Sequence, residues 1–393
     1  MPCVYHRNFR ILRTCGLRQT KTWRVEYISP RRVVCPQCRS STLKLYDHYS
    51  RQAAFINDEG ARRTLLIKAK RYKCQHCTYL FREPIEGLLP KKRSSEQYRQ
   101  AIAHEYIKNV NNKTIALEFN LSQSTVERII HERFELKIKE ALSYPAPLII
   151  GIDEHSIHKG RKFATTIADL ANHRVYDIIE GKSLASLESR LKSYQDRDKV
   201  NMVCMDLSHS YRSIVRRCFP NAKIVADRFH VIKMIQYHFM EFCKQAQESI
   251  RWKKPIIYPL RKKASNLKPR EQQTLNHLFE KNPAIGICYE FKEQLCDLLR
   301  LKTQTMKQCR RHIRKLKEIM GMLSHQAPLE LQKIGATLRT WYAPIIRMWR
   351  FSKNNGITEG FHRKMKLIQR RAYGYRNFEN YRLRVLVECG GFS

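Results

Sequence analysis

The middle of the chain combines short apolar runs with amphipathic segments, a pattern typical of a sheet covered by helices. Three strand-like runs come first without a helical segment between them, which predicts an antiparallel meander. Helices and strands then alternate, so further strands join a mixed sheet flanked by helices. We predict strands at 148–153, 162–169, 174–180, 200–206 and 222–227, and helices at 184–194 and from about 208.

Acidic residues stand at the ends of three of these apolar runs. Asp153 closes the first run, Asp206 closes the fourth, and Asp227 ends the fifth in the same way. A carboxylate at the point where a buried strand leaves its sheet is placed to hold a metal ion, because hard divalent cations prefer oxygen ligands. A second explanation remains for Asp206, which could instead cap the helix that begins near Ser208.

Helical periodicity replaces the strand pattern from 228 to about 350 and predicts an all-α segment. Prolines predict interruptions within it, because proline lacks the backbone N–H of a helix interior. The expected interruptions are at Pro255, Pro259, Pro269 and Pro283.

The chain is helical again from 357 onward. Glu359 lies at the start of this part, where it either completes a metal site or favours the helix dipole. A basic, aromatic stretch ends it, which either grips phosphates and stacks on bases or is an ordinary amphipathic helix. The candidate DNA contacts in this stretch are Arg370, Arg371, Tyr373, Tyr375 and Arg376.

Between 94 and 142 two helical segments are separated by a short polar break. Asn120 can end the first helix in the left-handed conformation, and Ser122 can cap the second. This order predicts a helix-turn-helix, whose second helix reads the DNA major groove. Short helical hairpins are also common for structural reasons alone. The exposed start of the second helix would present Gln123, Ser124, Thr125 and Arg128 to DNA.

Two Cys-x-x-Cys pairs lie in the N-terminal part of the chain. Cys35 and Cys38 form the first pair, and Cys74 and Cys77 form the second. A strand-like stretch at 64–72 leads into the second pair. Four thiolates with this spacing predict one structural Zn²⁺ ion held tetrahedrally, although the segment between the pairs is longer than in most zinc ribbons. The alternative is four unrelated free cysteines.

The 393 residues include 75 Lys and Arg against 35 Asp and Glu, a formal net charge of +40. Such a charge favours binding to the phosphates of DNA or RNA. An anionic membrane is the other possible polyanion, but no apolar stretch is long enough to cross one. The N-terminus lacks the pattern of a secretory signal, and the 13 Cys form no dense disulfide framework. We therefore expect a cytoplasmic protein.

The order of these parts resembles a bacterial insertion-sequence DDE transposase of the ISL-three family. Five short stretches carry the resemblance, which extends over nearly the whole chain. They are Gly151–His155, Asp206–Ser208, Ala226–His230, Thr358–Gly360 and Tyr373–Phe378. The predicted order of strands and helices is also that of an RNase H-like core.

The resemblance implies a catalytic triad of Asp153, Asp206 and Glu359, which hold Mg²⁺ (or Mn²⁺). Two such ions about 3.5–4 Å apart activate the attacking oxygen and stabilise the leaving oxygen of a phosphodiester displacement. Glu154 competes with Asp153, but strand alternation places the two on opposite faces, and the resemblance favours Asp153. Asp227 is a further candidate, either as a ligand or as a residue that positions the ligands.

We therefore predict a multidomain α+β protein. Its parts are a zinc-ribbon-like domain (1–92), a helix-turn-helix (93–144), an RNase H-like core (145–235 and 351–393) and an all-helical insertion (236–350). The implied function is a transposase that binds terminal inverted repeats and target DNA and performs metal-dependent strand cleavage and transfer. We expect a homodimer or higher oligomer on double-stranded DNA in the bacterial nucleoid. A non-catalytic DNA-binding regulator and a structure-specific nuclease are the alternatives.

Overall fold

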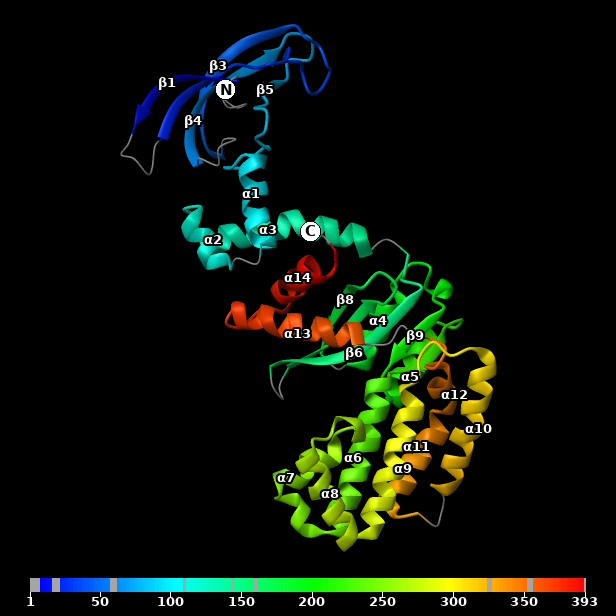
Figure 1. Ribbon diagram of the computed structural model, residues 1–393. Helices are drawn as coiled ribbons and strands as arrows, with labels where there is room; N and C mark the ends of the chain where they lie inside the picture. The colour runs from blue at the N-terminus through cyan, green and yellow to red at the C-terminus, as the bar shows by residue number, and fades with distance from the viewer. Residues whose placement is uncertain are drawn as a thin grey trace. The chain divides into compact units, whose positions relative to one another are not determined.

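The computed structural model describes residues 8–15, 22–56, 62–108, 111–142, 145–158, 162–181, 183–323, 327–351 and 356–391 (Figure 1). Contacts between residues divide the chain into two compact units, Met1–Leu136 and Lys137–Ser393. Helix α3 (Gln123–Leu142) crosses from the first unit into the second. The domain boundary expected near Tyr144 falls outside the described residues.

The first unit contains a five-stranded mixed sheet. Its strands run in the order β1-β2-β4-β3, and β5 pairs with β4. The predicted strand at 64–72 lies inside β4, whereas β1, β2 and β3 have no counterpart among the predicted strands. Apolar side chains such as Phe9, Phe55 and Leu65 form the core of this unit. The strands are β1 (Phe9–Cys15), β2 (Thr22–Tyr27), β3 (Leu43–Ile56), β4 (Arg62–Cys74) and β5 (Leu80–Arg82).

Three helices follow this sheet: α1 (Glu96–Ile107), α2 (Asn112–Glu118) and α3. Polar side chains stand at the starts of the first two, as helix capping requires. Ser95 accepts a hydrogen bond from a backbone N–H of α1, and Asn111 does the same for α2. Helix α3 packs against α1, where the rings of Phe134 and Tyr106 lie with centroids 6.0 Å apart, and Ile129 of α3 is buried.

The second unit contains a five-stranded sheet in the order β10-β9-β6-β7-β8. Strands β6, β7 and β8 form an antiparallel meander, and β9 and β10 continue it in the parallel direction. The predicted order of strands and helices is confirmed, and β7 and β8 have the predicted bounds. The strands are β6 (Ile149–His158), β7 (Lys162–Asp169), β8 (Arg174–Glu180), β9 (Met202–Met205) and β10 (Lys223–Ala226).

Strand β6 is longer than its apolar run. The run ends at Asp153, but β6 continues to His158 because β7 pairs with it that far. Asp153 pairs with Thr166 of β7 and therefore lies within a strand. The expectation that Asp153 closes its strand is wrong. The pairing of β6 with β9 on its other side does end before Asp153, at Gly151.

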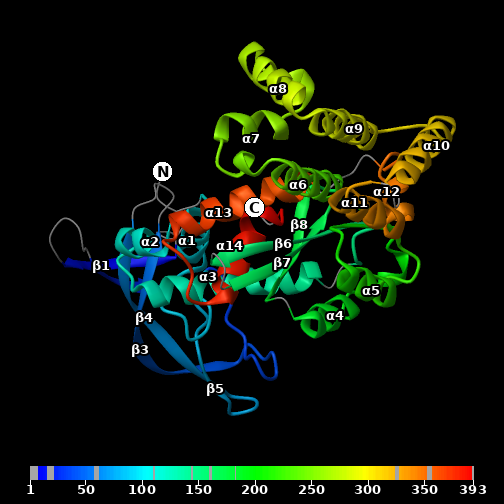
Figure 2. The same cartoon turned by 90° about the horizontal axis from the view of Figure 1, so that it is seen from below.

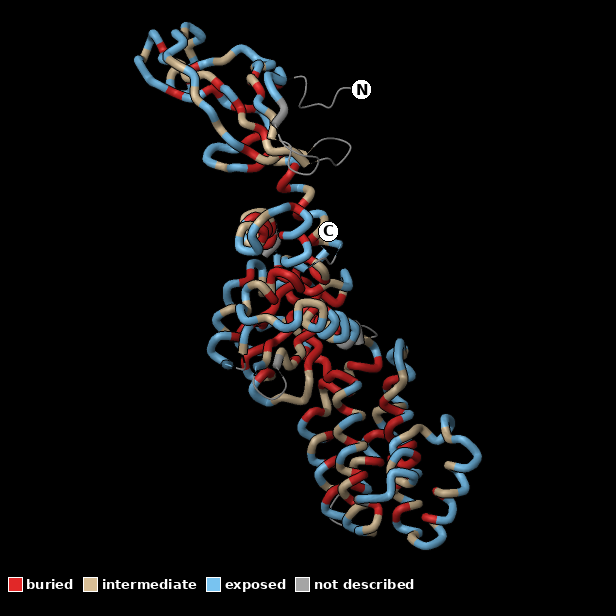
Figure 3. The backbone as a smooth tube through the Cα atoms, turned by 90° about the vertical axis from the view of Figure 1, so that its left-hand side faces the viewer, coloured by how far each residue is buried: buried red, intermediate tan, exposed pale blue. Residues whose placement is uncertain are grey.

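Helices cover both faces of this sheet (Figures 1 and 2). Tyr211 of α5 hydrogen-bonds Glu154 on one face, and Tyr381 of α14 hydrogen-bonds His155 on the other. Buried positions of this unit run through the sheet region and continue into the all-α segment (Figure 3). The covering helices include α4 (Leu184–Lys192), α5 (His209–Cys218), α13 (Gly356–Arg371) and α14 (Phe378–Cys389).

An all-α segment lies between β10 and α13, as predicted. Buried Arg228, at the start of α6, ties this helix to the ends of α9 and α12 by donating to the backbone carbonyls of Leu299 (2.9 Å), Leu301 (2.9 Å) and Met348 (2.7 Å). The α-helices of the segment are α6 (Arg228–Ala246), α7 (Lys254–Arg261), α8 (Pro269–Lys281), α9 (Pro283–Arg300), α10 (Met306–Met322), α11 (Leu329–Thr340) and α12 (Tyr342–Arg347).

The prolines of this segment do not all act as expected. Pro255, Pro269 and Pro283 stand in the first turns of α7, α8 and α9, where the missing N–H costs nothing. Pro259 lies inside α7, so the interruption expected there is wrong. The adjacent Leu260 is fully buried, and its packing favours the helix across this position. In the part of the chain that the structure describes, no helix combines the length and apolar character needed to cross a membrane.

Candidate functional site

Asp153 and Asp206 lie at corresponding positions of the neighbouring parallel strands β6 and β9. The last paired residues of these two strands are Gly151 and Cys204. Asp153 and Asp206 each stand two residues further along the chain. Because parallel strands keep this register, the two residues stand at the same level, Asp153 within β6 and Asp206 just beyond the end of β9.

Asp227 joins them from the next strand. Met205 of β9 pairs with Ala226 of β10, and these are the last residues of the two strands. Asp206 and Asp227 each follow directly after them. The backbone N–H of Asp227 donates to the carbonyl of Met205 at 2.7 Å and extends the pairing by one bond. Three aspartates therefore stand side by side on the neighbouring strands β6, β9 and β10.

Burial first, and then mutual proximity, makes these carboxyl groups harder to ionise. Burial, and then the charges of Asp227 and Asp206, raise the pKa of Asp153 to about 6, while His230 opposes this shift. Burial also raises the pKa of Asp206. A cluster of carboxylates with little access to water is costly when fully ionised. A bound cation would remove that cost.

Asp227 is already engaged on both carboxylate oxygens. It caps α6, where Oδ1 accepts from the backbone N–H of Phe229 at 3.1 Å. Oδ2 is 2.9 Å from Nδ1 of His230. This bond and the charges of Asp227, Asp153 and Asp206 raise the pKa of His230 against the effect of burial. The aspartates therefore favour the protonated form of His230.

Asp206 does not cap α5 itself. Ser208 occupies the N-cap position and accepts a hydrogen bond from the backbone N–H of Tyr211 at 3.3 Å. Oδ1 of Asp206 accepts from the N–H of Ser208 at 3.2 Å. Ser208, and not Asp206, is therefore the N-cap residue of α5. Asp206 orients the turn before the helix.

Glu154 faces away from Asp153. Its Oε1 accepts a hydrogen bond of 2.5 Å from the hydroxyl of Tyr211, which lies on the α5 side of the sheet. His362 of α13 contacts Asp153 on the opposite side, with 3.7 Å between His362 Nδ1 and Asp153 Oδ2. Asp153 and Glu154 therefore point to opposite faces of the sheet, as strand alternation predicts.

Glu359 lies in the first turn of α13, and its side chain is outside the described part of the chain. His362, three residues later, lies beside β7. Its Nε2 is 3.1 Å from the hydroxyl oxygen of Thr166, and the same hydroxyl is 3.0 Å from Nδ1 of His155. Sequence reasoning missed His362. The available signal was its spacing of three residues from Glu359, which places both positions on one helix face.

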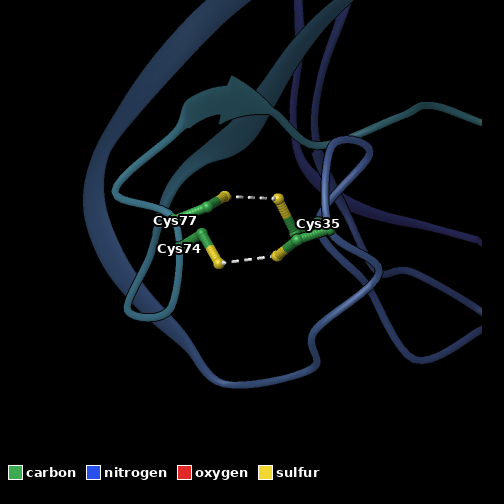
Figure 4. Close-up of side chains that lie close together, drawn as sticks. Cys35, Cys74 and Cys77 are labelled. Carbon is green, nitrogen blue, oxygen red and sulfur yellow. Dashed lines mark hydrogen bonds between the residues drawn. The ribbon is translucent and has the colours of Figure 1, made fainter.

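The four predicted zinc ligands converge (Figure 4). Among the described residues, Cys35, Cys38, Cys74 and Cys77 form the one group whose potential ligand atoms all lie within 4.8 Å of one another. The Sγ atoms of Cys35 and Cys77 are 3.5 Å apart, as are those of Cys38 and Cys74. A tetrahedral zinc with bonds of about 2.3 Å separates its sulfur ligands by about 3.8 Å, so the site fits zinc.

Both knuckles have the same backbone shape. The residue after each second cysteine, Arg39 or Thr78, is left-handed, with φ of 60° and 58°. The N–H of each first cysteine then donates across the knuckle to Ser40 or Tyr79, each at 2.9 Å. The backbone N–H groups of Cys77 and His76 lower the pKa of the Cys74 thiol to about 6, which favours the thiolate that zinc binds.

The turn between α2 and α3 follows the prediction. Asn120 is left-handed, with φ of 50°. The hydroxyl of Ser122 accepts from the backbone N–H of Thr125 at 3.2 Å and caps α3. Three of the predicted contacts, Gln123, Ser124 and Arg128, are exposed, and Thr125 is half-buried. This surface is available to a ligand.

The predicted C-terminal contacts separate into two groups. Arg371 pairs with Glu388 at 2.9 Å, and Tyr375 packs on Tyr381 with 5.4 Å between ring centroids, so both have structural partners. Arg370, Tyr373 and Arg376 are exposed. Tyr373 and Tyr375 lie in the turn between α13 and α14, which means that the amphipathic-helix explanation of these aromatics is wrong.

Comparisons with known proteins identify related sequences. Residues 150–385 match the ISL3 DDE family model, described as "Transposase", and residues 35–129 match a model described as a domain of unknown function. The chain is also 22% identical to the transposase for insertion sequence element IS1001 of Bordetella parapertussis. That alignment spans 370 residues and covers 91% of this chain and 89% of the relative.

Proposed function

Because the chain belongs to the ISL3 (ISL-three) family of DDE transposases, enzymes of DNA transposition, we propose that it binds the terminal inverted repeats of its insertion sequence and cuts and joins DNA strands. The proposed catalytic residues are Asp153, Asp206 and Glu359. The observation that carries this proposal is the shared level of Asp153 and Asp206 on parallel strands β6 and β9.

The strand order supports an RNase H-like core. A meander of three antiparallel strands is extended on its first strand by two parallel strands, each reached through a helix. In this arrangement the first strand of the meander, β6, is central, and its carboxylate lies next to that of the first added strand, β9. The all-α segment then enters between β10 and α13, so that α13 returns to pack against β6.

The proposed cofactor is Mg²⁺ or Mn²⁺, and the donors suit it. Oxygen ligands are the kind that these ions prefer, and Mg²⁺ retains waters and takes phosphate oxygens beside one or two carboxylates. When bound, the ions supply activation of the attacking oxygen and stabilisation of the leaving oxygen. Asp153 and Asp206 would hold them, and the burial that raises the pKa of both carboxyl groups supports a positive partner for these charges.

We include Glu359 in the triad because of its relation to His362. Both positions share one face of α13, and His362 contacts Asp153. Asp227 receives a different role, because the helix N-terminus and His230 occupy its two oxygens. We assign Asp227 to holding His230 against the other two aspartates.

The test of this function is a reaction with purified protein, Mg²⁺ and labelled DNA that carries the ends of the element. Cutting followed by joining of the new 3′ ends to a second duplex supports the transposase. Cutting alone would indicate a structure-specific nuclease, and binding alone a regulator. A duplex of the same length and scrambled sequence is the control for end recognition.

Replacing Arg128 with Ala should weaken binding to the terminal repeats and leave binding to scrambled DNA almost unchanged. Arg128 is exposed one turn into α3, where a recognition helix reaches base edges. The loss should be about 1–3 kcal/mol if Arg128 contacts a base. Fluorescence anisotropy with both duplexes measures it. Gln123→Ala belongs in the same series, and unchanged selectivity in both variants would place recognition elsewhere.

A further inference from the structure

A groove of about 720 Å³ lies within the first unit, beside the turn of the helix-turn-helix. Thr22 of β2, Thr64 of β4 and Ala54 of β3 line it where these three strands pair in register. The end of α2 and the turn that follows, Glu118–Leu121, also line it, together with Arg93. The groove therefore ends next to the start of α3.

Several contacts fix the shape of this groove. Arg62 of β4 bonds the carboxylate of Glu118 at 2.7 Å, and its guanidinium lies 3.8 Å from the centroid of the Phe119 ring. The hydroxyl of Tyr98 on α1 donates to the carbonyl of Phe119 at 2.6 Å. The backbone N–H of Ala54 donates to the carbonyl of Arg93 at 2.9 Å. These bonds join the sheet to the helix-turn-helix, so the walls of the groove are held in fixed positions relative to each other.

The charge of the groove is positive. Its lining includes Arg62, Arg63 and Arg93 against a single carboxylate, Glu118. Arg62 is paired with Glu118, so the charges of Arg63 and Arg93 remain in excess. Arg93 is exposed, while Arg63 lies half-buried over the ring of Trp23. The Nε atoms of Arg62 and Arg63 are buried and have no hydrogen-bond partner.

A phosphate group is the ligand that satisfies these conditions. It is anionic, it accepts several hydrogen bonds, and guanidinium groups bind it in the plane of their N–H donors. An apolar ligand would leave the two arginine charges uncompensated. The position beside the start of α3 is where DNA-binding helices are flanked by the sugar-phosphate backbone.

We propose that this groove holds the phosphate backbone of the duplex that α3 reads, with Arg63 and Arg93 as the phosphate contacts. The inference rests on the proposed recognition of terminal repeats by the helix-turn-helix. It gives the N-terminal sheet a direct part in DNA binding, since β4 supplies Arg63 and the segment paired to β3 supplies Arg93. Such contacts add affinity and fix register without reading sequence.

The experiment measures the affinity of the full-length protein for repeat and scrambled duplexes over a range of salt concentrations. Each phosphate contact contributes about 0.9 to the slope of log K against log salt. The double variant Arg63→Gln, Arg93→Gln should therefore lower this slope by about 2 on both duplexes. The ratio of repeat to scrambled affinity should stay the same, because the lost contacts carry no sequence information.

Arg31→Gln, Arg32→Gln is the matched control, because it removes the same charge from exposed positions of this unit outside the groove. Its slope should equal that of the wild type. An unchanged slope in the groove variant, or an equal loss in the control, overturns the proposal. Arg93→Gln alone leaves the contact between Arg63 and Trp23 intact and should lower the slope by about 1, which protects the test against misfolding of the double variant.

This experiment tests the recognition of terminal repeats by α3 and the phosphate contacts of the groove independently. A wild type that binds repeat and scrambled DNA equally contradicts recognition by α3. The salt slopes of the groove variants still report the phosphate contacts in that case, because those contacts act on any duplex.

Discussion

Replacing Asp206 with Asn should reduce DNA cleavage and joining by about 10³-fold or more. The amide keeps the shape of the side chain but removes the negative charge of a proposed metal ligand. Metal ions contribute several kcal/mol to this class of reaction, and each 1.36 kcal/mol is about a factor of ten in rate. The same loss is expected for Asp153→Asn and Glu359→Gln. Single-turnover rates with labelled element ends in Mg²⁺ measure it.

Two comparisons make this result specific. Asp198→Asn removes the same charge from an exposed position of the same unit and should leave the rate unchanged. Asp227→Asn should give an intermediate loss, because it releases His230 without removing one of the proposed ligands. Binding to DNA should persist in all of these variants, since affinity arises mainly from basic surfaces. Full activity of Asp206→Asn, where the wild type requires Mg²⁺, would disprove the mechanism.

The sheet of the second unit was predictable because its strands are buried and apolar. The runs at 162–169 and 174–180 coincide with β7 and β8, and the Asn120 turn follows from local backbone preferences alone. The second half of β6 was not predictable in this way. Residues after Asp153 are largely polar and are held in the strand by β7, a partner that the local pattern does not reveal.

The missed parts of the first unit have a related cause. Strand β3 is mostly exposed in its first half, so no apolar alternation marks it. This segment is a strand because it pairs with β4 along nearly its whole length. The groove combines Arg63 with Arg93 and the turn at Asn120 through tertiary contacts only. His362 reaches Asp153 across more than two hundred residues of chain, and its spacing from Glu359 was the single local hint.

Replacing Cys74 with Ser should release zinc and unfold the N-terminal sheet while the second unit stays folded. Structural zinc contributes on the order of 10 kcal/mol in small domains, which is comparable to the whole stability of a typical domain. Cys74 is the last residue of β4, the strand that pairs with β2, β3 and β5. Loss of the ion therefore removes a constraint at the end of the central strand. Metal analysis should find one zinc per wild-type chain, and limited proteolysis should show cleavage confined to the first unit of the variant.

Two further variants separate ligation from packing. Cys288→Ser makes the same chemical change at a half-buried position outside the knuckles and should retain both zinc and protease resistance. Cys74→His replaces the thiolate with an imidazole, which zinc also accepts, so it should keep more zinc than Cys74→Ser. A role in packing alone predicts the reverse, because serine is closer to cysteine in size. Wild-type protein without zinc, or a Cys74→Ser variant with an intact N-terminal sheet, would exclude the zinc site and leave the 3.5 Å sulfur contacts as a cluster of free thiols.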